Sequence, residues 1–366
     1  PVEFHLGGSS DEQNEILLRE ALIDTFKNLD LDYRKWILPL SGGYDSRGIL
    51  CLLLETNPNN KYLKTVTWGL KSSLKKKGND AYVARELAER LHMSNSYYAN
   101  DLFGEPVEIV IKRFVLAGEG LIDNIADYLD GFNMWKKIYE DGVEGIIRGD
   151  EGFGCKPYSS ALAARMNQGL TLCSDLSNLK DYLKYGFPLQ ELPQYLKQRK
   201  GETLSTWRDR LFHTHTLSVE FAALSDLKLS FVEQINPLLS KKILELVRQL
   251  PDHLRTGKSL FKKIVDSISP EINYAKNESS ASLCEILKQE QIVSFIRSEL
   301  SKDFAKTILP GPFLDFVLKG LETKAQKGVS IKPKSVSSRS YIGLLIPRFM
   351  KETLRTKIIA HSLDNN

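Results

Sequence analysis

The first 150 residues alternate between two hydrophobic periodicities. Residues 10–28 carry apolar positions on one helical stripe, and a compact apolar run follows at residues 36–40. The alternation continues and predicts further helices over residues 44–55, 80–91, 105–117 and 125–141, and further strands over residues 63–68, 96–99 and 144–148. Strands that alternate with helices in this way predict an α/β fold with a doubly wound parallel sheet.

Beyond about residue 158 the pattern predicts helices without strands. These helices span residues 188–198, 205–225, 239–249, 259–268, 283–300, 312–326 and 340–360. We therefore expect two parts, an α/β core over residues 1–157 and a mostly helical, substrate-side region over residues 158–366. Residues 70–79 and 327–340 are predicted as flexible loops, and the tail at 331–358 is basic. Such a tail suits a solvated face or a docking surface for an acidic or carrier-borne substrate.

The apolar run at 36–40 ends in Ser41-Gly42-Gly43-Tyr44-Asp45-Ser46, directly before a predicted helix. Glycines allow close backbone approach to a ligand and positive φ angles, and the amides at a helix N-terminus bind phosphate-like anions. Ser41 and Ser46 add hydroxyl donors. A bare anion would repel Asp45, so we expect a divalent cation on the phosphates as its partner. An ordinary strand-to-helix turn would account for the glycines but not for these polar neighbours.

A second Gly-rich loop, Gly149-Asp150-Glu151-Gly152-Phe153-Gly154, follows the strand predicted at residues 144–148. Acidic turns with glycine are common, so this loop indicates a ligand site only in combination with the first loop. Ligands of doubly wound sheets lie at the carboxyl ends of the strands, where Ser41, Gly69 and Gly149 all fall. Asp45 and Asp150, from different strands, are therefore predicted to hold one Mg²⁺ against a polyphosphate.

The six-residue loop Ser-Gly-Gly-x-Asp-Ser resembles the pyrophosphate loop of the N-type ATP pyrophosphatases, which have an adenine nucleotide alpha hydrolase-like (HUP) fold. No Walker loop occurs. With the second loop, the chain resembles more narrowly the asparagine synthase-like amide-forming enzymes over roughly residues 12–270. Further matching segments are Thr67-Trp68-Gly69, Asn79-Asp80, Asn236 to Ser240, Leu250-Pro251 and Gly257 to Lys263. Two departures concern the substrate side: Ser240 replaces an acid of the family, and the R-x-K-x-G-F segment is not recognisable in residues 272–282.

The resemblance implies an ATP- and Mg²⁺-dependent ligase that adenylates a substrate carboxylate, releases pyrophosphate and lets an amine or ammonia displace AMP. It implies that ATP contacts a set of loop residues, namely Leu40, Ser41, Gly42, Gly43, Asp45, Ser46, Thr67, Trp68, Gly69, Gly149, Asp150 and Glu151. It also implies a lysine at the α-phosphate, Lys262, or with a shifted register Lys258 or Lys263. Glu119 is the expected base for the amine, with Asp123 and Asp127 as alternatives.

The composition excludes few classes of binding partner. The formal net charge is +4, which gives weak support for a nucleic-acid partner, and no apolar run is long enough to span a bilayer. Four scattered cysteines form no CxxC motif, so we expect a reducing, cytoplasmic setting. The chain begins with Pro rather than Met and shows no glutaminase cysteine or domain before the synthetase region. Either the chain was processed or cut, or ammonia comes from a separate partner, or the amine belongs to the substrate.

Two other readings stay open. The same loop occurs in tRNA-modifying ATPases of the PP-loop type, although the weak charge and the missing CxxC argue against thiolation. A non-catalytic scaffold of a larger complex would also retain the fold, but it would have no need of Asp45.

Overall fold

A five-stranded parallel sheet lies at the centre of the computed structural model, which describes residues 2–57, 62–101, 105–281 and 286–326. The strand order is β3-β2-β1-β4-β5, and every neighbouring pair is parallel. The strands are β1 (Trp36–Pro39), β2 (Lys64–Gly69), β3 (Ser94–Ala99), β4 (Gly145–Ile147) and β5 (Glu233–Ile235). The predicted doubly wound α/β fold is confirmed.

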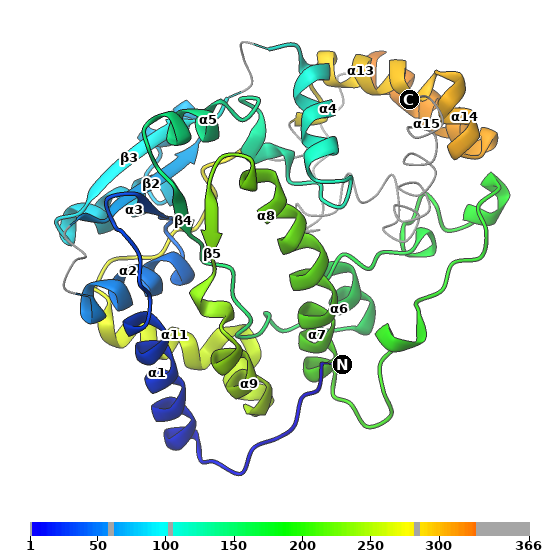
Figure 1. Cartoon of the computed structure of the whole chain (residues 1–366). Coiled ribbons are helices and arrows are strands. Elements are labelled where there is room, and N and C mark those ends of the chain that lie inside the picture. Colours follow the sequence, from blue (N-terminus) through cyan, green and yellow to red (C-terminus); the bar gives the residue numbers. More distant parts are fainter. Residues whose placement is uncertain (1, 58–61, 102–104, 282–285, 327–366) are drawn as a thin grey trace.

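Helices cover both faces of the sheet (Figure 1). Ile37 and Leu38 alternate in β1, so their side chains enter two different hydrophobic clusters. One cluster joins the sheet to α1 (Asp11–Lys27), α2 (Tyr44–Thr56), α3 (Asp80–Arg90), α9 (Lys241–Gln249) and α11 (Ser259–Ile268). The other joins it to α4 (Val107–Ala117), α5 (Asn133–Glu140), α8 (Ala222–Leu229) and α13 (Glu290–Leu300).

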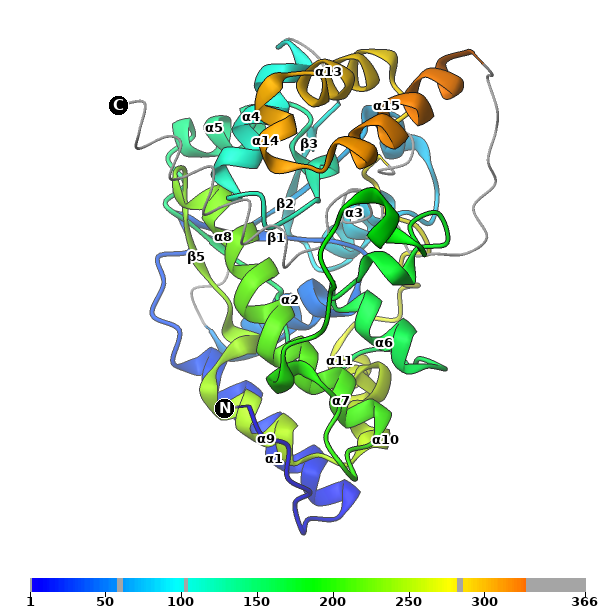
Figure 2. The same cartoon turned by 90° about the vertical axis from the view of Figure 1, so that its right-hand side faces the viewer.

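The remaining helices lie on the side of the molecule that faces the viewer in Figure 2. They are α6 (Ala161–Asn167), α7 (Leu204–Leu211), α10 (Asp252–Arg255), α14 (Asp303–Ile308) and α15 (Gly311–Gln326). Two smaller apolar clusters join four of these helices: residues 173–187 pack against α14 and α15, and α6 packs against α7. The short α10 instead contacts α11. The helix-rich second half is thus also confirmed.

Polar side chains at the helix ends account for two of the starts. Ser10 and Gln13 form a reciprocal capping box that begins α1. The Asn79 side chain accepts from the Tyr82 amide at the start of α3 and donates to the Ser73 carbonyl, so the cap also fixes the preceding turn. That turn, predicted as a flexible loop, contains the 3₁₀ helix Lys71–Lys75.

Several sequence predictions differ from the structure. Residues 188–198 contain only the short 3₁₀ turn Gln194–Leu196 in place of a helix. The helix predicted over 125–141 is broken between the 3₁₀ turn Ile125–Tyr128 and α5, because Gly131 and Phe132 take left-handed backbone angles. The helix predicted over 205–225 continues as one run, but its centre is the π-helix Phe212–Phe221.

The strand β5 is not predicted by the sequence pattern. It pairs with β4 and comes from the half predicted to hold helices only. The helix predicted at 283–300 begins later, as α13 at Glu290, and residues 282–285 lie outside the described residues. The helix predicted at 340–360, the loop at 327–340 and the basic tail at 331–358 also lie outside them.

Candidate nucleotide site at the carboxyl edge of the sheet

The two Gly-rich loops lie side by side where the strand order reverses. β2 and β3 lie on one side of β1, whereas β4 and β5 lie on the other. Doubly wound sheets bind ligands in the crevice at this switch point. A Cβ added to Gly149 would lie 3.4 Å from the Cβ of Asp45, so the second loop touches the first.

Side chains fix the shape of the first loop. The Ser46 hydroxyl accepts from the Ser41 amide at 3.0 Å, and the Ser41 hydroxyl accepts from the Gly43 amide at 3.2 Å. Asp80, at the start of α3, accepts from the Gly42 amide at 3.0 Å. The loop amides therefore have protein partners, and the group left for an anion is the first turn of α2, whose N-cap Gly43 supplies no side-chain cap.

The glycines of this loop are not required for a left-handed backbone. Neither Gly42 nor Gly43 has a positive φ. Gly42 is needed for packing, because a Cβ there would lie 2.4 Å from the Cβ of Ala275 and 3.0 Å from that of Val83. At Gly42 the close approach is therefore to another part of the chain, whereas a Cβ on Gly43 would meet only Ser41 Oγ, at 3.4 Å.

Lys258 joins the two loops through their carboxylates. Its Nζ lies 2.8 Å from both Asp45 oxygens and 2.9 Å from Glu151 Oε1. Burial works against the charged lysine, but Glu151 and Asp45 outweigh it and raise its pKa above the ordinary value. Burial raises the pKa of Glu151, and Lys258 counters that effect. Two carboxylates from different strands thus converge on one cation.

Asp150, the expected partner of Asp45, is engaged elsewhere. Arg148 donates to both of its oxygens, at 2.7 and 3.1 Å. Behind this pair lies the buried Lys228, which donates to the Leu224 carbonyl and lies over the rings of Tyr128 and Trp135. Burial, and then the nearby Arg148, lower the pKa of Lys228 well below its ordinary value. The structure brings Glu151, rather than Asp150, together with Asp45.

The three candidate lysines have separate surroundings. Lys258 bridges the loops as described, whereas Lys262 lies over the Tyr44 ring, 5.0 Å from its centroid. Lys263 pairs with Glu15 at 2.6 Å on the surface. Among the alternatives left open by the sequence, Lys258 is the one in contact with Asp45.

Two of the candidate bases, Glu119 and Asp127, lie in different surroundings. Glu119 lies in an exposed turn after α4 and has a positive φ of 51°. Asp127 is half-buried and accepts hydrogen bonds from Ser280 and, at 3.0 Å, from Asn124. Ser280 belongs to the segment that crosses the strand ends, so Asp127 is connected to this edge of the sheet.

Residues 272–280 form a strap across the ends of β1 and β2, which the sequence did not reveal. Ala275 N donates to the Gly42 carbonyl at 3.0 Å, and the Tyr274 ring stacks on Tyr44 with centroids 3.6 Å apart. At the β2 end, Ser279 Oγ donates to the Trp68 carbonyl at 2.7 Å, and a Cβ on Gly69 would lie 2.6 Å from Ser279. The strap therefore borders both the anion loop and the expected adenine side.

Other expected contacts of this edge lie in the sheet itself. Thr67 Oγ1 donates to the Leu40 carbonyl at 2.7 Å, and Leu40 N donates to the Val66 carbonyl at 2.8 Å. These bonds fix the strand ends beside the loops. Next to them, Asn100 donates its backbone amide to the Gly69 carbonyl, while its buried side-chain amide has no hydrogen-bond partner within the described part of the chain.

The residues fit a magnesium nucleotide. The carboxylates of Asp45 and Glu151 already bind one positive group, the Lys258 ammonium, at 2.8–2.9 Å. The first turn of α2, which has no side-chain cap, begins beside them. Oxygen ligands of this kind are those that Mg²⁺ prefers. Across residues 2–326, outside the three short gaps, no group of three or more His, Cys, Asp or Glu side chains could hold a metal by itself. A metal here would need ligands from the nucleotide as well.

No family model and no curated protein matches the sequence. Among solved structures, the chain is similar to the U34-tRNA thiolase NcsA from Methanococcus maripaludis with its [4Fe-4S] cluster. The identity is 15%, the match covers 89% of this chain and 84% of the thiolase, and the TM-score is 0.28. A likeness of this size carries no argument about function. The class defined by the structure itself is a doubly wound α/β protein with two acid-bearing loops at its switch point.

None of the helices in the described ranges is both long and apolar enough to cross a membrane.

Proposed function

We propose that this protein is an ATP-dependent, AMP-forming amide ligase of the PP-loop type. The single observation that carries the proposal is the meeting of Asp45, Glu151 and Lys258 beside the uncapped start of α2. A charged group from each of two strand ends, a lysine and a helix N-terminus form a site for a polyphosphate and its metal. The Ser-Gly-Gly-x-Asp-Ser sequence supports ATP as that polyphosphate.

Asp45 and Glu151 would hold Mg²⁺, with Asp150 as the ligand expected from the sequence and now paired with Arg148. When bound, Mg²⁺ would neutralise charge on the departing pyrophosphate. Ser41 and Ser46 fix the loop through their hydroxyls, which keeps the first turn of α2 directed at the phosphates. This pre-organisation is what phosphoryl chemistry requires of a protein.

Lys258 would act in the first step, the attack of a substrate carboxylate on the α-phosphorus. Its raised pKa keeps the ammonium charged at neutral pH. A permanently charged lysine cannot serve as a base, but it stabilises the negative charge that develops in the transition state. Lys262, the lysine expected from the sequence, is about one helical turn further on and lies over the Tyr44 ring.

In the second step an amine or ammonia would displace AMP and lose a proton. Asp127 is half-buried and hydrogen-bonded to the strap, so it suits a base near the nucleotide better than the exposed Glu119 does. The carboxylate substrate is a small molecule or peptide, and it would approach from the helical half of the chain. Ammonia from a separate protein or an amine on the substrate would each satisfy this step.

The test is exchange of labelled pyrophosphate into ATP, measured with a panel of small carboxylates and peptides. We expect Lys258→Met to lower the exchange rate by roughly 10²–10³-fold, as for the loss of one preorganised charge contact. Lys263→Met is the matched control, because this lysine lies only five residues away but pairs with Glu15 at the surface. Equal rates in the two variants would contradict the proposed role of Lys258.

The same assay separates the other functions. Exchange that requires bulk tRNA in place of the small carboxylates and peptides would identify a tRNA-modifying enzyme. An absence of both ATP binding and AMP formation would identify a scaffold.

A further inference from the structure

Lys258 lies on a backbone turn that is unfavourable by itself. Gly257 and Lys258 have φ angles of 67° and 62°, both in the left-handed region. A side chain with a Cβ is disfavoured there, so surrounding contacts must hold the turn. One of them is direct: Gly257 N donates to the Cys155 carbonyl at 2.8 Å. The turn is thus attached to the loop that carries Glu151.

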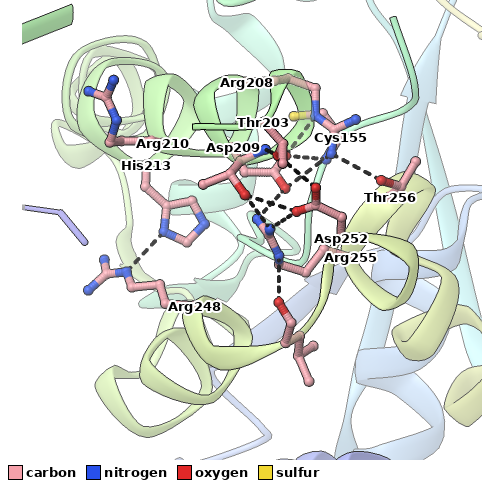
Figure 3. A network of polar contacts seen from close by, with 12 residues as sticks. Cys155, Thr203, Arg208, Asp209, Arg210, His213, Arg248, Asp252, Arg255 and Thr256 are labelled. Carbon is pink, nitrogen blue, oxygen red and sulfur yellow. Dashed lines mark hydrogen bonds and ion pairs between the residues drawn. The ribbon is translucent and has the colours of Figure 1, made fainter. Parts of the chain in front are cut away.

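A buried ionic network lies behind this attachment (Figure 3). Asp209, on α7, is completely buried and accepts from Arg255 at 2.7 Å and from the Cys155 amide at 3.2 Å. Arg255 comes three residues before Lys258, and Cys155 comes four residues after Glu151. One carboxylate therefore joins the two chain segments whose side chains meet at the site.

Arg208 also joins the loop that carries Glu151 to the turn that carries Lys258. It donates to Asp209 at 2.8 and 3.1 Å, to the Lys156 carbonyl at 3.0 Å and to Thr256 Oγ1 at 3.4 Å. Lys156 again belongs to the loop segment, and Thr256 belongs to the turn. Asp209 is the anion shared by two buried guanidinium groups: it pairs with Arg208 and, together with Asp252, with Arg255. Its charge therefore offsets much of the cost of burying both.

The two segments are also in close backbone contact. A Cβ on Gly154 would lie 2.4 Å from the Arg255 carbonyl oxygen. A shift of Arg255 would therefore be transmitted directly to the loop and to the turn. Close-packed interiors transmit such displacements because they contain few voids to absorb them.

We infer that Asp209 is a positioning residue for Lys258. Through Arg255 and the Cys155 amide it fixes the left-handed turn that places the Lys258 ammonium between Asp45 and Glu151. The consequence for catalysis rests on the proposed function, whereas the placement of Lys258 can be measured whether or not the protein is a ligase.

The experiment measures the placement by trace acetylation with acetic anhydride and mass spectrometry of the full chain. In the native protein the Lys258 ammonium is held by two carboxylates, so it should react slowly. Asp209→Asn should raise its labelling severalfold and leave Lys263 in the same sample unchanged. Asp175→Asn is the matched control, because it also breaks a buried Arg–Asp pair, with Arg165, outside this network.

Asp209→Asn leaves the buried Arg208 without its anion and leaves Arg255 with Asp252 alone, so its thermal unfolding is measured first. If it does not fold, Gly257→Ala decides, because a Cβ there meets nothing within 4 Å but opposes the left-handed turn. Gly142→Ala, with a φ of 83° and equally open space, carries the same strain in a different loop. Higher Lys258 labelling in Gly257→Ala than in Gly142→Ala would support the inference, because Asp209 is inferred to act through this turn. Equal labelling would show that the turn does not place Lys258 and would overturn the inference.

Activity gives a second readout. Asp209→Asn, or Gly257→Ala in its place, should lower pyrophosphate exchange by roughly 10²-fold, the loss that about 1 Å of misplacement can cause. In a Lys258→Met background the same change should cause no further loss, since it acts through that lysine. A further loss in the double variant, or unchanged Lys258 labelling in a folded Asp209→Asn protein, would overturn the inference. If the native protein shows no exchange, the proposed function fails and the labelling result still stands.

Discussion

At the scale of single residues, neighbouring acids of the second loop have opposite surroundings. Asp150 is bound on both oxygens by Arg148, whereas Glu151 faces Asp45 through Lys258. Adjacent residues of an extended loop point in different directions, so one can complete a structural ion pair while the other serves the site.

This difference leads to a test with two variants. Asp150→Asn leaves the largely buried Arg148 without its partner, and we expect it to lower the free energy of unfolding by about 3–5 kcal/mol. Glu151→Gln should cost less stability, but should lower pyrophosphate exchange more strongly. Urea unfolding and the exchange assay on both variants measure this. The opposite order would return Asp150 to the metal site that the sequence predicted.

His213 supplies a second residue-scale prediction. Its Nε2 lies 2.8 Å from the Gly152 carbonyl, and Arg248 Nε lies 3.3 Å from its Nδ1. Burial lowers the pKa of His213 to about 4. Because the folded pKa is lower than the unfolded one, the unfolded state takes up the proton first as the pH falls from about 6.5. The histidine therefore contributes stability that is present above pH 6.5 and is lost toward pH 4.

We expect this contribution to fall by about 2 kcal/mol between pH 7 and pH 5. The measurement compares urea unfolding of the native protein and of His213→Gln at both pH values. His253→Gln, at an exposed histidine, controls for the substitution. Parallel pH profiles for the native protein and His213→Gln would show that His213 is not the group responsible.

At the scale of elements, the strap at residues 272–280 packs directly against the first loop. Arg47, on α2, donates to the carbonyls of Ile272 and Asn273 at 2.7 and 3.2 Å and lies over the Tyr274 ring. The strap is therefore held by the same helix whose N-terminus faces the anion site. A nucleotide at this edge would be bordered by the strap as well as by the sheet.

The packing of strap against loop can be tested by a compensating pair. Gly42→Ala should overpack the contact with Ala275 and cost about 1–3 kcal/mol of stability. Ala275→Gly, added to it, removes the opposing methyl group and should restore part of that loss. Urea unfolding of the two single variants and the double variant gives the coupling energy. Additive effects would mean that the two residues do not oppose each other.

The elements also show what the sequence could supply. The first loop, α2 and α11 were predictable because their signals are local: two glycines after an apolar run, and apolar residues on one helical stripe. β5 was not, because Glu233-Gln234-Ile235 is too short for a periodicity and becomes a strand only beside β4. The choice among the three lysines depended on the left-handed turn at Gly257 and Lys258, which sets the direction of each side chain.

At the scale of the whole molecule, the boundary predicted near residue 157 separates two sequence patterns, but the hydrophobic core contains residues from both sides of it. Leu38 and Ile147 share a hydrophobic cluster with Ile243 and Phe261 from the second half. The site is shared in the same way, since Asp45 and Glu151 meet Lys258. The network around Asp209 was beyond sequence analysis, because it joins α7, the second loop and α10 through buried charges far apart in the chain.

The late position of β5 also affects how the chain is made. β4 ends at Ile147 and β5 begins at Glu233, so synthesis at about 5–20 residues per second separates the two strands by roughly 4–17 s. During that interval a nascent chain would present the apolar Gly145–Ile147 edge without its neighbour. Parallel pairing over such sequence separations is slow even after the partner exists. On the ribosome this edge is where we expect a chaperone to be needed first, and where crowded expression would lead to aggregation.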